Sequence, residues 1–397
     1  MNTSSVCLNG SIIEDSPLFG QFGWPENEPD LNANWTTMAP EVRDILCARC
    51  VESISLPTTE WWSSRTQDVY PIELAIRDYL NHRLLQFNSR SIFSNCEETS
   101  LKIKAAIENN GEIIILLPVF CVISSWQKRH HVTSVTLAEE VSLLHLARIA
   151  RNMKDNSGVG LKFRIISDAT FYAGIFGDPM DAAERYIGDL HALTVKHGIV
   201  HEIEILDMSS IVASDQARYD QSLQAHLTAY QNDPSLGITL DETYRFTASV
   251  GSTVNIEDYN LNYAQRRAIF CDAVFPSLTV RKDIMDRISN AFIHYRAMKA
   301  SMSDLQWESE MYPEALRGTI HHKTLPVLGV RIYPSYKRQS SLLPYHGIAV
   351  ISRNGEKWQM AIEHEIHQRS DMLRVAKPDG ASDFYIDEDS LSYLPQS

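Results

Sequence analysis

Histidines and cations gather in one acid-free stretch of the chain, from Arg317 to Val350. The chain carries a formal charge of -14, yet no Asp or Glu lies between Glu314 and Glu356, where its average composition would place about five. An acidic protein with one such basic segment is expected to bind an anion there. Because imidazole titrates nearest neutral pH, the histidines could move protons beside that anion. A solvated basic strip with histidines in the core is the alternative, and charge alone leaves the two interpretations even.

The histidine spacing does not favour a metal site. His321 and His322 are adjacent, so on a strand they would face opposite sides and could not hold one ion together. His364 and His367 are three residues apart and do not match the zinc-binding H-E-x-x-H motif. We therefore expect proton transfer and anion binding without a metal.

Strands buried on both faces are the elements expected to position these groups. Glu112 to Cys121 is an unbroken apolar run rich in β-branched residues, which is typical of such a strand. Further strands are predicted at Phe163–Ile166 and Glu202–Asp207, with helices between them that include one capped at Thr136. This alternation predicts an α/β fold with a doubly wound, mostly parallel sheet.

Polar residues follow the predicted strands at their carboxyl ends, where open α/β sheets bind ligands. Lys128 follows the first strand, and Ser167 and Asp168 end the second. The third strand closes with Asp207. We interpret Asp168 as a site residue, although Asp is also a common helix N-cap. The small and aromatic residues after Asp168, 169–175, are predicted to form a loop.

Three segments are expected along the chain: a helical N-terminal extension at 1–110, an α/β core at 111–300 and a smaller C-terminal part at 301–397. Strands of the last segment are predicted at 319–321, 327–332 and 347–352. Beyond Glu363 no periodicity is strong enough to predict an element. Lys282 belongs to a basic doublet on a predicted core helix and is a further candidate for anion binding, although such doublets are usually solvated.

Several protein classes are disfavoured by the whole chain. The negative charge argues against nucleic-acid binding, which needs a basic face. The longest apolar run, Ile113–Ile123, is far short of a membrane span, and the N-terminus lacks the pattern of a signal peptide. Cysteines are few, and Cys47-Ala-Arg-Cys50 lacks the second pair of a zinc site, so reduced thiols and a cytoplasmic location are expected. No dinucleotide fingerprint, P-loop or G-x-S-x-G motif occurs.

Three stretches in order resemble one family. They are Leu117-Pro-Val-Phe120, Arg164-Ile-Ile-Ser-Asp168 with Tyr186 on the following helix, and Arg317-Gly-Thr-Ile-His321 paired with Pro344-Tyr-His-Gly347. In this order and spacing the chain resembles the isonitrile (isocyanide) synthases, which are grouped with the pyoverdine and dityrosine biosynthesis proteins. The resemblance covers well over half of the chain.

The resemblance implies a Rossmann-like enzyme that uses no metal or other cofactor. Such enzymes convert the α-amine of an aromatic amino acid, tyrosine or tryptophan, to an isonitrile and take the added carbon from ribulose 5-phosphate. An oxygenase dependent on iron and 2-oxoglutarate often acts on the product, so such an enzyme is a possible pathway partner.

The site residues that follow divide into two groups. The catalytic group comprises His321, His346, Asp168 and Lys323. Two histidines could protonate a leaving hydroxyl and take protons from carbon. Lys323 could instead form a Schiff base with the ketone. The substrate-binding group comprises Arg317, Arg331, Ser167, Arg164, Tyr345, Lys128 and Lys282, with arginines suited to phosphate and carboxylate.

The chain departs from the family pattern at three places that flank the expected pocket. Ala169 replaces a glycine, Tyr345 replaces a tryptophan, and residues 122–127 differ from the usual Lys-Ser-x-Asn. These departures leave the amino acid substrate open. They also keep two alternatives: a family member that condenses an amine with a sugar phosphate without forming an isonitrile, and a non-catalytic binding protein on the same fold.

Overall fold

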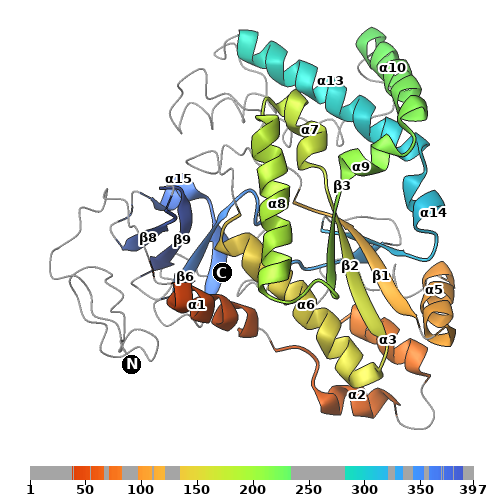
Figure 1. The fold of residues 1–397 in the computed structure, drawn as a ribbon, viewed down its shortest axis with the longest axis vertical. Coiled ribbons are helices and arrows are strands. Elements are labelled where there is room, and N and C mark those ends of the chain that lie inside the picture. Colours follow the sequence, from red (N-terminus) through yellow and green to blue (C-terminus); the bar gives the residue numbers. More distant parts are fainter. Residues whose placement is uncertain are drawn as a thin grey trace.

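A parallel sheet wrapped by helices, with a smaller second sheet beside it, makes up the fold (Figure 1). The structure is a computed structural model. It describes residues 38, 40–53, 55–66, 71–82, 97–109, 111–120, 135–233, 282–320, 327–333, 343–352, 357–367, 369, 371–378 and 380–387.

The main sheet has five strands in the order β3-β2-β1-β4-β5. They are β1 (Glu112–Pro118), β2 (Gly160–Ser167), β3 (Ile203–Asp207), β4 (Leu316–Thr319) and β5 (Leu328–Gly329). Every neighbouring pair is parallel, which confirms the predicted mostly parallel sheet. The sheet has five strands because β4 and β5, from the predicted C-terminal part, continue it beside β1.

Helices cover both faces of this sheet, which explains the unbroken apolar run of β1. Ile113, Ile115 and Leu117 belong to the main core, whereas Leu116 faces a second apolar cluster on the other side. The main core is covered by α6 (Leu137–Ser157) and α8 (Met180–Lys196). The second cluster is covered by α9 (Met208–Ala213), α10 (Gln216–Asn232), α13 (Lys282–Asp304) and α14 (Trp307–Met311).

Two local predictions have different outcomes. Thr136 caps α6 in the predicted capping box with Glu139. The loop predicted at 169–175 is wrong, because these residues form the helix α7 (Ala169–Phe176). Its apolar side chains, including Tyr172 and Phe176, are buried against neighbouring helices, and this tertiary burial outweighs the weak helical tendency of a small and aromatic run.

The second sheet contains β6 (Ile348–Ser352), β7 (Trp358–Ala361), β8 (Met372–Ala376) and β9 (Ser382–Asp387), in the order β7-β6-β9-β8. The short helix α15 (Glu363–Ile366) follows β7. Only β6 was predicted. All residues of β8 and β9 are buried, so these strands show no alternation of apolar and polar residues that could be seen in the sequence.

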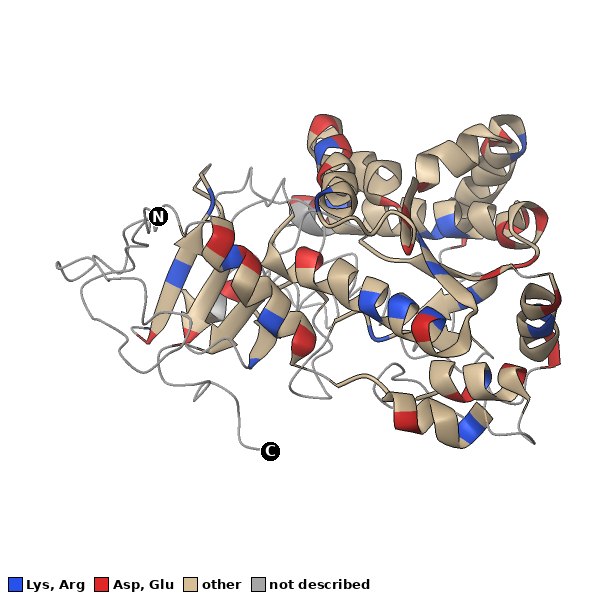
Figure 2. Cartoon of the chain, turned by 60° about the horizontal axis from the view of Figure 1, so that its bottom comes forward, with Lys and Arg blue, Asp and Glu red and all other residues tan. Residues whose placement is uncertain are grey.

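The N-terminal helices pack on the body of the protein. They are α1 (Pro40–Glu52), α2 (Thr59–Thr66), α3 (Ile72–Leu80) and α5 (Glu97–Glu108). The main core joins apolar residues of α1, the parallel sheet and β9, so one core spans all three predicted segments, and the division into three stays a prediction. Figure 2 shows charged residues of both signs over the helices and the second sheet. Among the described helices, none has the length and apolar character needed to cross a bilayer.

Candidate active site

The carboxyl end of β2 brings Ser167 and Asp168 to the edge of the parallel sheet. The buried Ser167 hydroxyl donates to the backbone carbonyl of Phe120, two residues beyond β1, at 2.7 Å. Asp168 is half-buried and occupies the N-cap position of α7, but its side chain accepts no hydrogen bond from the first turn of the helix. Asp168 therefore occupies the N-cap position without capping the helix through its side chain, and it stays a candidate for chemistry.

The end of β3 supplies a second polar cluster beside the first. The Asp207 carboxylate accepts hydrogen bonds from the Thr170 hydroxyl at 2.6 Å and from the Ser209 backbone amide at 3.0 Å. The Thr170 and Ser209 hydroxyls lie 2.9 Å apart. Asp207 thus joins the first turn of α7 to the first turn of α9 and holds the backbone around Asp168. Thr170 was not identified from the sequence, because its role depends on two helices meeting.

Tyr345 and His346 reach the same edge from the turn before β6. The backbone amide of His346 donates to the Leu343 carbonyl at 2.9 Å, and the Gly347 amide donates to the same carbonyl at 3.0 Å. The Tyr345 ring lies 6.0 Å from the Phe120 ring and 4.5 Å from the His346 imidazole, measured between centroids. Ser167, Tyr345 and His346 are therefore brought together through Phe120, although they are far apart in the sequence.

Arg164 and Arg317 lie in one row across the sheet, on either side of Leu116. Neighbouring strands are about 4.8 Å apart, so the two arginine backbones are separated by about 10 Å. Both guanidinium groups are ion-paired. Arg164 contacts Glu204 at 2.7 Å and lies over the Tyr312 ring, and Arg317 contacts Glu308. Both precede the carboxyl ends of their strands, so they lie on the helix-covered face and not at the edge.

Arg317 lines a small cavity of about 260 Å³ between α5 and α14. Lys102 of α5 also lines it and donates to the Ala315 carbonyl at 2.9 Å. Partial loss of hydration lowers the pKa of the Arg317 guanidinium to about 10, so it remains a cation at neutral pH. Lys102 was not among the predicted residues, since nothing in the sequence links α5 to β4.

Gly318 determines how closely β4 approaches β1. A Cβ atom there would lie 2.9 Å from the Ile115 Cγ2 atom and 3.1 Å from the Leu116 carbonyl oxygen. Any larger residue would push β4 away and move Arg317 with it. Gly318 occupies the x position of the R-x-T-I-H stretch. The motif leaves this position unspecified, although the packing of β4 against β1 requires glycine there.

Arg331 lies just beyond β5 and is half-buried beside α6. Its charge is one of the causes that lower the pKa of His145, a buried residue of α6. Burial, followed by the charges of Arg148 and Arg331, lowers the pKa of His145 to about 3, so this imidazole is neutral at physiological pH. Arg331 therefore faces the α6 side of the sheet, whereas Arg317 faces the α14 side.

The other predicted site residues lie outside what the structure describes. His321, Lys323 and Lys128 belong to undescribed segments. Lys282 begins α13, and its side chain is outside the described part. The roles predicted for these four residues stay predictions. Within the described residues, no three or more His, Cys, Asp or Glu side chains gather as a metal site would require.

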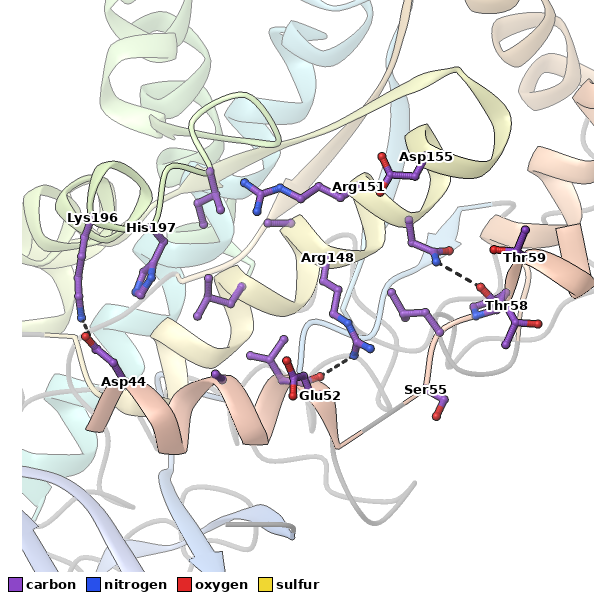
Figure 3. Close-up of a pocket in the computed structure, with 18 of the residues that line it drawn as sticks. Asp44, Glu52, Ser55, Thr58, Thr59, Arg148, Arg151, Asp155, Lys196 and His197 are labelled. Atoms are coloured by element: carbon purple, nitrogen blue, oxygen red, sulfur yellow. Dashed lines mark hydrogen bonds and ion pairs between the residues drawn. The ribbon is translucent and has the colours of Figure 1, made fainter. Parts of the chain in front are cut away.

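A larger cavity of about 850 Å³ lies between α1, α6 and the end of α8 (Figure 3). Asp155 and Ile199, which precede β2 and β3, line it, so it lies at the amino ends of these strands. Its cations serve the fold: Arg148 donates to the Val51 carbonyl at the end of α1, and Lys196 contacts Asp44 at 2.8 Å. The carboxyl edge is therefore the better candidate for chemistry.

The Cys47 and Cys50 thiols lie on α1 near this cavity and are buried. Burial raises the pKa of both thiols well above the ordinary value, with the Glu140 carboxylate adding to the effect at Cys47. Thiols that stay protonated are poor nucleophiles and metal ligands. The C-x-x-C spacing is thus part of the core.

Comparison with known proteins places this chain in a family. The chain is 22% identical over 285 residues to the L-tyrosine isonitrile synthase of Xenorhabdus nematophila, which covers 68% of this chain and 80% of that protein. Its fold is similar to the crystal structure of PvcA from Pseudomonas aeruginosa, with a TM-score of 0.50 and 17% identity over 86% of this chain and 100% of that one. The family model for pyoverdine/dityrosine biosynthesis proteins matches residues 103–373, which include β1 to β6 and the carboxyl edge. The chain therefore belongs to the pyoverdine/dityrosine biosynthesis protein family.

Proposed function

We propose that this protein is an isonitrile synthase. It converts the α-amine of an amino acid, most favourably the aromatic tyrosine or tryptophan, to an isonitrile and takes the new carbon from ribulose 5-phosphate. The observation that carries the proposal is the similarity to an L-tyrosine isonitrile synthase over 285 residues, supported by the family model that matches residues 103–373, which include the carboxyl edge. We further propose that the sheet is used in the Rossmann-like manner, with substrates outside the carboxyl ends of its strands.

The chemistry requires groups that move protons. When the amine attacks the ketone, a carbon–nitrogen bond forms and the carbonyl oxygen leaves as water, so one group must protonate the hydroxyl and another must accept protons. His346 and Asp168 are half-buried at the edge and suit these roles, together with His321. The amino acid carboxylate and the sugar phosphate are anions. Arg331, half-buried just beyond β5, is one proposed partner, and Arg317 could be the other only if it left its ion pair with Glu308.

Carbon tracing tests this function. Purified protein is incubated with ribulose 5-phosphate carrying carbon-13 at the carbonyl and with each standard amino acid in turn, and products are weighed by mass spectrometry. The expected product is heavier than one amino acid by a single labelled carbon and lighter by two hydrogens. Reactions without sugar phosphate, or with protein denatured beforehand, serve as controls. No labelled product with any amino acid would contradict the proposal.

A changed reaction on the same scaffold is the second candidate. Tyr345 stands where the resemblance expects tryptophan, and it packs directly between the Phe120 ring and the His346 imidazole. A different residue at this contact would alter the pocket beside the proposed acid–base group. Consumption of ribulose 5-phosphate with an amine, but without an isonitrile, would favour this candidate.

A further inference from the structure

Phe120 adopts an unusual backbone conformation at the carboxyl edge. Its φ angle is +63°, in the left-handed region that residues with a side chain rarely occupy. The ring is nevertheless fully buried, at 0% exposure, so the conformation is combined with tight packing. Strained residues of this kind persist where the surroundings hold them, and they often occur at functional sites.

Two contacts hold Phe120 in this conformation. On the backbone side, its carbonyl accepts the hydrogen bond from Ser167, whose hydroxyl is itself fully buried at the end of β2. On the side-chain side, its ring meets the Tyr345 ring in an edge-to-face arrangement with an interplanar angle of 65°. The strained residue thus links the ends of β1 and β2 to the turn that precedes β6.

The turn before β6 places Tyr345 between Phe120 and His346. Tyr345 is 2% exposed, so protein atoms surround its ring on nearly all sides. The adjacent His346 imidazole is half-buried and lies 4.5 Å from the Tyr345 ring, at an angle of 56°. A shift of the Phe120 ring would therefore be passed through Tyr345 to the imidazole.

We propose that Phe120 is a positioning residue for the carboxyl-edge site: its left-handed backbone conformation, held by the Ser167 hydroxyl, packs the ring against Tyr345 and thereby orients the His346 imidazole. The effect of this orientation on catalysis rests on the proposed function, whereas the orientation itself does not. The proposal also gives Ser167 a role in the fold of the edge, in place of direct contact with substrate.

The first experiment reads the position of His346 without any activity. Full-length protein is labelled with carbon-13 in its histidine rings, and the His346 signal is identified by its loss in His346→Gln. In Phe120→Ala the His346 signal should shift and titrate at a different pH from the parent. The matched control is Phe384→Ala, which truncates an equally buried phenylalanine of β9. A His346 signal that is unchanged in Phe120→Ala, or changed equally in both variants, would overturn the proposal.

Backbone strain is tested by a second substitution at the same position. Glycine adopts a positive φ without a steric cost, so Phe120→Gly should melt at a higher temperature than Phe120→Ala although it removes one more carbon. The His346 signal should move in both variants. If Phe120→Ala does not fold, Phe120→Gly and Phe120→Leu carry the same measurement, and leucine should restore most of the parent signal because it keeps apolar bulk against Tyr345.

The last experiment uses the reaction. Misplacement of a catalytic group by about 1 Å can lower the rate about 100-fold, so Phe120→Ala should lower kcat by about 10- to 100-fold with little change in KM. If Phe120 acts through His346, adding Phe120→Ala to His346→Gln should cost almost nothing further. Independent, multiplying losses would overturn the positioning role. A parent protein without isonitrile activity would instead refute the proposed function, while the histidine signals would still decide the proposal.

Discussion

Two polar regions of this protein are built in opposite ways. Around Glu140, on the first turn of α6, buried charges are matched by charges: this fully buried carboxylate contacts Arg43 of α1 and Lys196 and His197 at the end of α8. Arg43 also contacts Asp383 of β9 at 2.6 Å. At the carboxyl edge, Ser167, Thr170 and Asp207 are held by hydroxyl and backbone hydrogen bonds instead.

The difference separates a region that holds the fold from a region available for chemistry. The Glu140 network joins segments from both ends of the chain, and Asp383 additionally accepts the Leu137 amide at the start of α6, at 2.8 Å. An anion arriving there would meet carboxylates already in place. At the edge, by contrast, the half-buried His346 lies against the neutral Tyr345 ring, and the Ser167 hydroxyl is held by a backbone carbonyl.

Removing the centre of the charge network should have the largest effect. Glu140→Ala leaves Arg43, Lys196 and His197 without their shared carboxylate, and breaking a buried pair in this way costs about 3–5 kcal/mol. The free energy of unfolding, measured by urea denaturation, should fall by that amount. The control Glu184→Ala removes an exposed carboxylate of α8 and should change it by less than about 0.5 kcal/mol. Equal losses of unfolding free energy in the two variants would show that the Glu140 network does not hold the fold.

Removing the proposed acid–base group should affect rate and not stability. His346→Gln should lower kcat about 100-fold or more, since general acid–base catalysis typically contributes that much. Its melting temperature should stay close to the parent value, because the imidazole is only half-buried. His191→Gln, on the exposed surface of α8, should leave both unchanged. A His346→Gln variant with parental kcat would show that the edge works through other residues.

Gly318 shows that the edge region has a steric requirement even without a charge network. Gly318→Ala forces a methyl group against β1, and overpacking of this kind costs about 1–3 kcal/mol. Gly188→Ala is the matched control, because a Cβ there meets nothing within 4 Å and alanine favours helix α8 by up to about 1 kcal/mol. The two variants should therefore shift the denaturation midpoint in opposite directions. A stabilised Gly318→Ala would mean that β4 does not need its close approach to β1.

The smallest effect is the pH dependence of the charge network. Burial by itself would raise the pKa of Glu140, but the hydrogen bonds and charges of His197, Arg43 and Lys196 outweigh it, so the pKa lies well below the ordinary value of 4.5. A lowered folded-state pKa gives stability that is complete above the ordinary value and is lost as the pH falls below it. The difference in unfolding free energy between the parent and Glu140→Gln should thus shrink from about pH 6 to about pH 3. A constant difference would show that charge is not what Glu140 contributes.

The sequence by itself determined the α/β class and the parallel sheet. The apolar run of β1 and the alternation of strands and helices follow from local composition, as does the capping box at Thr136. It also indicated Ser167 and Asp168 as strand-end residues, because chain order alone places them after β2. Their proposed roles remain predictions that the experiments above address.

Only the tertiary structure decided which of these groups meet. Phe120 joins Ser167 to Tyr345 across more than half of the chain, and β8 and β9 form a sheet although their uniform burial leaves no pattern to detect. The structure also placed Arg164 and Arg317 in one ion-paired row away from the edge, which their basic character could not indicate. Side-chain type is a local property, whereas the neighbours that orient or neutralise a side chain come from packing between distant segments.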